Sequence, residues 1–242
     1  MRTGMLTQVL LFALVPMAVL VLTGLVATFR TLGPRLRSAL QHFAAGVVFE
    51  AAAVEVLPEV RRAQSAFPII IGFVLGAGLV LAVGQLGKRA ERTEQEGKAS
   101  PVGLLTVVGI DVLIDGLLIG IGFVGGAKVG LLLTLALTTE FLFVGLTTAS
   151  TLAATGLSRL RVLAGSTLLA VLVLVGAASG ASVLSTAPEA LQVGVLSFGV
   201  AALLYLVTEE LLVEAHEVKE TTFAAAMFFV GFLFFLVIGL FG

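Results

Sequence analysis

Six acidic residues stand inside long apolar stretches of this 242-residue chain. A carboxylate near the centre of a membrane costs about 2.5 to 3.5 kcal/mol even on lenient scales, so an acid kept there is normally functional. All 14 Lys and Arg residues fall between the apolar stretches or at their ends, which leaves the acids without a counterion at their depth. Such acids either carry protons and hydrogen-bond between helices, or face water and bind a cation. The six are Glu50, Asp111, Asp115, Glu140, Glu209 and Glu210.

The spacing of three of these acids favours a bound cation. Asp111 and Asp115 are four residues apart, so in a helix they lie on one face, one turn apart. Glu140 falls near the middle of the next apolar stretch, with Thr138 and Thr139 beside it as neutral oxygen donors. Three or more oxygens around one point suit a hard or borderline divalent cation. The pattern predicts a metal site between two neighbouring helices.

The elements that position these acids are predicted to be membrane helices. The chain is 59% apolar and 12% charged, compared with about 25% charged in a soluble domain. A helix rises 1.5 Å per residue, so about 20 apolar residues cross a hydrocarbon core of about 30 Å. We expect one transmembrane domain, residues 1–242, that is all-α with eight spans. These lie near residues 5–29, 38–58, 67–86, 101–124, 129–155, 162–185, 190–214 and 221–241.

Basic residues predict the orientation of these spans, because Lys and Arg accumulate in cytoplasmic loops. The breaks after spans 1, 3, 5 and 7 hold ten of them and the other side holds four. We therefore expect both termini on the non-cytoplasmic side of a cell membrane that the chain crosses several times. Residues 87–100 form the expected charged cytoplasmic loop. Residues 5–29 are longer than a signal-peptide core and lack an A-x-A-like site, so they are interpreted as the first span.

Composition excludes several classes of function. A net charge of −1 gives no basic face for nucleic acid, and the absence of cysteine excludes disulfides and thiolate metal ligands. No nucleotide-binding loop, Ser-His-Asp set or zinc-hydrolase motif occurs, so we expect neither an enzyme nor a prosthetic group. The expected partners are membrane lipid and divalent metal ions, and a homodimer is left open.

Four segments around the acids share a family pattern. They are Asp111-Val-Leu-Ile-Asp115-Gly116 with Gly120 and Phe123; Glu140 to Gly145 with Gly156-Leu157-Ser158-Arg159; His42-Phe-Ala-Ala-Gly46 continuing to Leu57-Pro58-Glu59; and Thr208-Glu209-Glu210-Leu-Leu-Val-Glu214-Ala-His216. Together they resemble the ZIP (zinc/iron permease) family of metal transporters, in particular its compact prokaryotic members. The resemblance covers nearly the whole chain.

The resemblance implies a fold and a function. Its eight spans would form a 3+2+3 arrangement, in which spans 1–3 and 6–8 are inverted repeats around spans 4 and 5, with both termini outside. It implies a transporter that moves divalent cations such as zinc, iron or manganese by alternating access. Without a nucleotide-binding loop, transport would follow a gradient of metal, proton or voltage.

The chain departs from the family at its metal ligands. Asp111 replaces the family's histidine, Asp115 its glutamate one turn later, and Glu140 the first ligand of the fifth helix. The family's ligands of a second metal fall on apolar residues, and the sixth helix has no acid; the apolar positions are Val112, Phe141 and Val144. The departures imply one ion instead of two, in a carboxylate-rich site that favours manganese, ferrous iron or magnesium over zinc.

Further candidate ligands follow from the same comparison. Glu209 stands at the position of a family histidine, and Glu50 could add a carboxylate, so both are predicted to join the site. Glu210, Glu214 and His216 could form a cytoplasmic exit site. Two other functions stay open: a ZIP-fold metal sensor or interaction module that does not transport, and a proton-coupled solute transporter.

Overall fold

The computed structural model describes residues 2–29, 33–93, 100–218 and 221–241, and within these ranges it is entirely helical, without a strand. The predicted all-α class is therefore confirmed. The α-helices are α1 (Arg2–Ala27), α2 (Pro34–Glu50), α3 (Leu57–Arg62), α4 (Ala66–Thr93), α5 (Pro101–Gly125), α6 (Ala127–Ala154), α7 (Arg159–Leu184), α8 (Glu189–Tyr205), α9 (Leu212–Ala215) and α10 (Thr222–Phe241). Two π-helical segments, η1 (Ala51–Val56) and η3 (Leu206–Leu211), join α2 to α3 and α8 to α9.

Seven helical stretches in the described residues are long and apolar enough to cross a membrane, as expected of a multi-pass membrane protein. They are Gly4–Ala27, Ala66–Lys88, Pro101–Gly125, Ala127–Ala154, Arg159–Leu184, Glu189–Ala215 and Thr222–Phe241. The expected second span is also one continuous helical rod, from Pro34 to Arg62, but it is not among the seven. Acids and arginines along this rod reduce its apolar character.

The third expected span continues farther than predicted. α4 runs to Thr93, so residues 87–93 of the expected cytoplasmic loop are helical, and residues 94–99 of that loop lie outside the described residues. The sequence loses its apolar character after residue 86, and this predicts that the third span ends there. Lys, Arg and Glu are good helix formers, however, so a helix can continue through a charged segment once it leaves the apolar layer.

Proline and glycine explain two local features of the backbone. Pro58 has no N–H to donate, and its ring crowds the carbonyl four residues earlier, which favours a widened turn just before it. The π-helical η1 occupies that place. Gly126 alone separates α5 from α6 and has φ +143°, a backbone conformation that side-chain-bearing residues rarely adopt. This one-residue turn places α5 and α6, the two helices of the predicted metal site, side by side.

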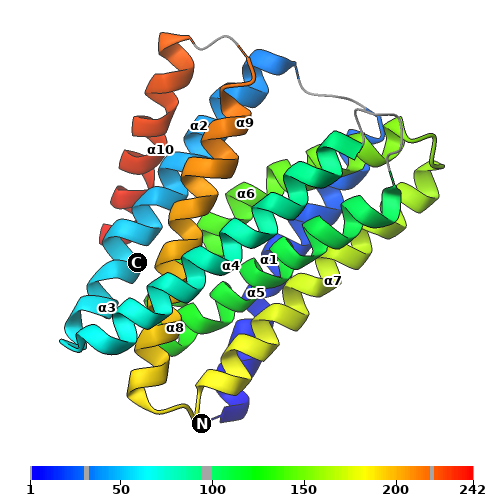
Figure 1. The fold of residues 1–242 in the computed structure, drawn as a ribbon. Coiled ribbons are helices and arrows are strands. Elements are labelled where there is room, and N and C mark those ends of the chain that lie inside the picture. Colours follow the sequence, from blue (N-terminus) through cyan, green and yellow to red (C-terminus); the bar gives the residue numbers. More distant parts are fainter. Residues whose placement is uncertain (1, 30–32, 94–99, 219–220, 242) are drawn as a thin grey trace.

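We divide the helices into two groups by their contacts. The site bundle comprises α1, α5, α6 and α7, with α5 packed along α7 and α1 packed along both α6 and α7. The flanking bundle comprises the other helices, with α2 packed along α10 and α4 along α8. Contacts between the bundles involve mainly α2 with α6 and α4 with α5, and they are about as sparse as those that join the α2–α10 pair to the α4–α8 pair. In Figure 1, α1 begins at the lower end, which we call the N-terminal end, and α10 descends toward it.

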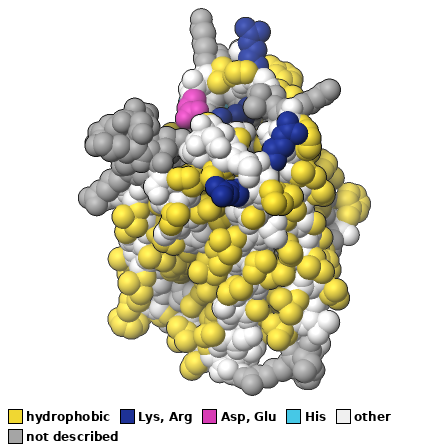
Figure 2. Space-filling model, turned by 90° about the vertical axis from the view of Figure 1, so that its right-hand side faces the viewer, with side chains coloured by type: hydrophobic (Ala, Val, Ile, Leu, Met, Phe, Trp, Pro, Cys, Tyr) yellow, Lys and Arg dark blue, Asp and Glu magenta, His cyan; other side chains and the backbone are white. Residues whose placement is uncertain are grey.

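Glycines allow the helices to approach closely. A Cβ at Gly116 would stand 2.4 Å from the Val173 carbonyl oxygen, and one at Gly120 would stand 2.2 Å from that of Ala177, so α5 and α7 pack backbone to backbone. Such small-residue interfaces are typical of membrane helices. Around this packing, hydrophobic side chains cover the lateral face of the molecule, and Lys and Arg lie near its upper end (Figure 2).

Candidate metal centre

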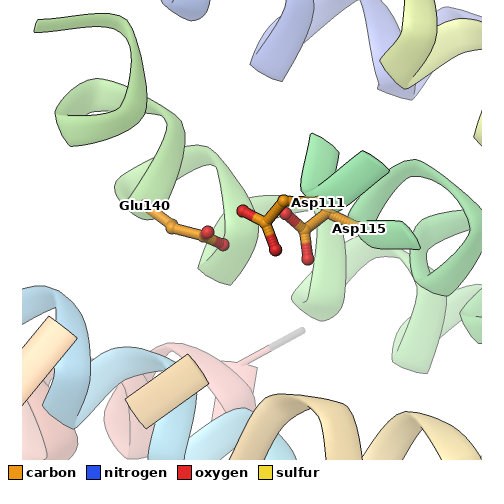
Figure 3. A group of neighbouring side chains, drawn as sticks. All are labelled: Asp111, Asp115 and Glu140. Carbon is orange, nitrogen blue, oxygen red and sulfur yellow. The ribbon is translucent and has the colours of Figure 1, made fainter. Parts of the chain in front are cut away.

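Three acids from two adjacent helices meet inside the site bundle. Asp111 and Asp115 project from α5 and Glu140 from α6, and their carboxylates point toward one another (Figure 3). One oxygen from each lies within 4.8 Å of the others. Among the described residues, these three are the acids or histidines that lie close enough together to hold one metal ion. The grouping of Asp111, Asp115 and Glu140 is therefore the one that the sequence predicted, and we call these residues the carboxylate triad.

The triad is buried and lacks protein counterions. Asp115 is 4% exposed and Glu140 1%, whereas Asp111 is half-buried. Asp115 Oδ2 and Glu140 Oε2 have no hydrogen-bond partner among the described residues. None of the ion pairs in the described part of the chain joins a Lys or Arg to a triad residue. Burying carboxylates without partners is strongly unfavourable, so the triad needs protons or a cation to be stable.

The distances fit a single cation of moderate size. Oxygens on opposite sides of a calcium-like ion, at about 2.3 to 2.6 Å from it, are at most about 4.6 to 5.2 Å apart. Ions bound at about 2.0 to 2.2 Å require the carboxylates to close by a few tenths of an ångström. The Thr138 and Thr139 hydroxyls donate to carbonyl oxygens of their own helix, those of Thr134 and Ala136, each at 2.6 Å. Their oxygens would have to complete the shell through the remaining lone pairs.

Helix α8 continues into η3, and of the two acids there it is Glu210, not Glu209, that interacts electrostatically with the triad. The negative charge of Glu210 repels the negative charges of Asp115 and Glu140. Glu209 is exposed and its Oε2 lies 3.6 Å from Lys88 Nζ. The structure thus does not bring Glu209 into the triad, although the family resemblance implied it.

The structure also keeps Glu50 apart from the triad. Glu50 is the last residue of α2, in the flanking bundle, and is fully buried. It is absent from the group formed by Asp111, Asp115 and Glu140. The two charges that act on it are instead those of Glu55 and Lys128. Glu50 therefore occupies a separate environment.

Glu214 lies on the side of the triad that faces away from the N-terminal end of the bundle. Its charge acts on Asp111 and Glu140, and its carboxylate accepts hydrogen bonds from Arg37 Nη2 at 3.0 Å and Gln41 Nε2 at 2.6 Å. These contacts tie α9 to the start of α2. Glu210 and Glu214, two residues of the predicted exit site, thus both influence the triad electrostatically.

His216, a residue of the predicted exit site, lies beside His42, the other histidine of the chain. The rings of His42 and His216 meet edge to face with centroids 5.1 Å apart. His42 is only 2% exposed; its Nδ1 lies 2.9 Å from the Ser38 carbonyl oxygen, and its Nε2 has no partner among the described residues. The family pattern includes His42 but does not indicate that it is buried. The i, i+3, i+4 spacing of Ser38, Gln41 and His42 is the signal of a polar helix face that could have identified it.

Chemically, the triad offers oxygen ligands only, which suit a hard or borderline divalent cation. Further donor groups lie on other helices: the carboxylates of Glu210 and Glu214 and the two imidazoles. Comparison of the chain with protein-family models and with curated proteins yields no match.

Proposed function

We propose that this protein is a ZIP-like transporter of divalent cations, and that the carboxylate triad is its single intramembrane binding site. The observation that carries the proposal is the meeting of three acids within 4.8 Å on adjacent helices, two of them buried and one half-buried, with no basic partner among the described residues. A chain that kept this arrangement only for stability would face a desolvation cost that apolar residues avoid. A cation that visits the site compensates that cost.

The packing of the helices supports alternating access between the two bundles. The densest packing lies within the site bundle and within the α2–α10 and α4–α8 pairs, so these can keep their internal packing while the sparser junctions between them change. The triad lies in the site bundle, and Glu210 and Glu214 lie on the flanking bundle. Relative movement of the bundles would therefore change which acids face the bound ion.

Helix pairing also supports the inverted repeat and the eight-span count. We count the rods 34–62 and 189–215 as spans two and seven. An inverted repeat exchanges span one with six, two with seven, three with eight and four with five. Under this exchange the packing of α5 on α7 becomes that of α6 on α1, and the packing of α2 on α10 becomes that of α8 on α4. The same exchange maps η1 onto η3. Internal symmetry of this kind is typical of secondary transporters, with the substrate site at the interface of the repeats.

The ligand set favours hard ions over zinc. Asp111, Asp115 and Glu140 supply oxygen, and histidine is absent from the triad. Oxygen-only sites suit manganese, magnesium and ferrous iron, whereas zinc more often takes nitrogen or sulfur. We therefore rank manganese and ferrous iron above zinc as substrates.

The proposal is tested by metal flux into liposomes that contain the purified protein. We expect uptake of at least one divalent cation, its loss in Asp115→Asn and Glu140→Gln, and its retention in Glu189→Gln, a control at an exposed helix start. Wild-type flux in both site variants would refute the assignment. Tight binding without flux would select the metal-sensor alternative, and flux of an organic solute that ignores divalent metals would select the proton-coupled one.

A further inference from the structure

Glu50 is a buried carboxylate that the metal centre does not use. Its side chain has no exposed surface, and neither carboxylate oxygen has a hydrogen-bond partner among the described residues. Leaving an ionised carboxylate in that state costs several kcal/mol. Glu50 therefore needs a bound species that neutralises it.

The surroundings of Glu50 select a proton instead of a metal ion. In the described part of the chain the triad is the group of three or more acidic or histidine ligands, so Glu50 belongs to no such group, and Glu55 is the acid whose charge acts on it. Calcium takes six to eight oxygen ligands, and magnesium demands a near-octahedral shell. A buried carboxylate with at most one neighbouring acid does not provide such a shell, and it is neutralised instead by taking up a proton.

A short polar connection leads from Glu50 toward the N-terminal end of the bundle. In the π-helical η1, which follows directly, hydrogen bonds span five residues, and this brings Glu55 closer to the face of Glu50 than a regular α-helix would. The Glu55 carboxylate lies against α10, with Oε1 2.8 Å from the point where Gly239 would carry a Cβ. Lys128 Nζ, from α6, donates to the Gly239 carbonyl oxygen at 2.6 Å.

The charged groups around Glu50 are few. Glu55 comes from η1 and Lys128 from α6, and their charges are the ones that act on Glu50. α10, which packs along α2, contains no titratable side chain. Burial, first, and then these two charges, both on the side of the N-terminal end, therefore control the charge state of Glu50.

Lys128 also connects Glu50 to the movement of the bundles. Its hydrogen bond to Gly239 joins the site bundle to the flanking bundle. An ionised Glu50 attracts Lys128 across this junction, whereas a protonated Glu50 does not. A proton at Glu50 thereby changes the attraction between the two bodies whose relative movement would carry the cation.

We propose that Glu50 is a proton-binding site separate from the metal centre, reached through Glu55 from the N-terminal end, and that its proton exchange is coupled to cation transport. The coupling rests on the proposed function, whereas the proton site does not. The carboxylate takes up one proton to become a neutral carboxylic acid and later releases the same proton, so no other bond forms or breaks.

Infrared difference spectroscopy tests the proton site without transport. In a pH titration of the lipid-reconstituted protein, we expect the carbonyl stretch of protonated carboxyl groups to be weaker by one group in Glu50→Gln than in the wild type. Glu59→Gln is the matched control, because Glu59 lies on the same helical rod but is paired with Arg62 at 2.5 Å. An unchanged carboxyl band in Glu50→Gln would overturn the proton site.

Metal flux under a pH gradient tests the coupling. With one coupled proton, each unit of pH difference across the membrane changes the equilibrium metal accumulation of the wild type about tenfold. Glu50→Gln should bind metal normally and lose this dependence, and Glu50→Asp should keep it. A full pH effect in Glu50→Gln, or loss of metal binding in it, contradicts the proposal. A wild type that moves no metal refutes the proposed function, and the infrared result alone then decides the proton site.

Discussion

Replacing Glu140 by glutamine removes one negative charge from the triad and keeps the shape of the side chain. At the 4.8 Å upper limit of the oxygen separations, two ionised carboxylates repel by about 3.5 kcal/mol at an effective dielectric constant of about 20. Glu140 takes part in two such pairs, with Asp111 and Asp115. Without metal, Glu140→Gln should therefore unfold at a temperature no lower than the wild type, which a purely structural role for the carboxylate does not predict.

In the presence of a divalent metal, the wild type should instead unfold at a higher temperature than Glu140→Gln. A divalent ion at 100 times its Kd stabilises the protein that binds it by about 2.7 kcal/mol. Charged contacts of this kind are worth about 1.5 to 3 kcal/mol, so losing one carboxylate should weaken binding about 100-fold. At the same metal concentration the stabilisation of Glu140→Gln then falls to about 0.4 kcal/mol.

Thermal unfolding of the purified protein, followed by circular dichroism across a series of divalent ions, measures both effects. Glu189→Gln serves as the control, because Glu189 is exposed at the start of α8. Metal stabilisation of Glu140→Gln equal to that of the wild type would refute the reasoning. So would a wild type that no divalent ion stabilises.

Three further predictions concern packing, the exit route and orientation. Gly116→Ala should lower the free energy of unfolding by about 1 to 3 kcal/mol, because its Cβ would meet a carbonyl oxygen of α7 at 2.4 Å; wild-type thermal stability would contradict this. Calorimetric titration should show weaker metal binding in Glu210→Gln than in Glu209→Gln, and the reverse order would restore the family-based assignment. The chain has no cysteine, so single thiols in Thr186→Cys and Thr221→Cys should react with impermeant reagents from outside and from the cytoplasm, respectively; labelling from the same side would refute the topology.

The triad could be predicted because its determinants are local. Asp111 and Asp115 share a helix face through their spacing alone, and the single-residue break at Gly126 makes the next helix an antiparallel neighbour. Glu140 then follows from its depth in that helix. Each step needs only helix geometry and the length of an apolar stretch.

The choice between Glu209 and Glu210 could not be predicted in the same way. Both lie in η3, where a π-helical turn holds more residues than an α-helical one and changes the face on which each side chain falls. An α-helical period therefore misplaces them. The separation of Glu50 from the triad depends on which helices become neighbours, and no short-range pattern contains that information.

The central claim, that one cation is held by carboxylates alone, is tested most directly by manganese binding to the purified protein. Equilibrium dialysis with electron paramagnetic resonance gives both the number of bound ions and the type of ligand atom. We expect one Mn²⁺ per chain with oxygen ligands only, and none in Asp115→Asn combined with Glu140→Gln. Two ions per chain, nitrogen coupling from a histidine, or full binding by the double variant would contradict the assignment.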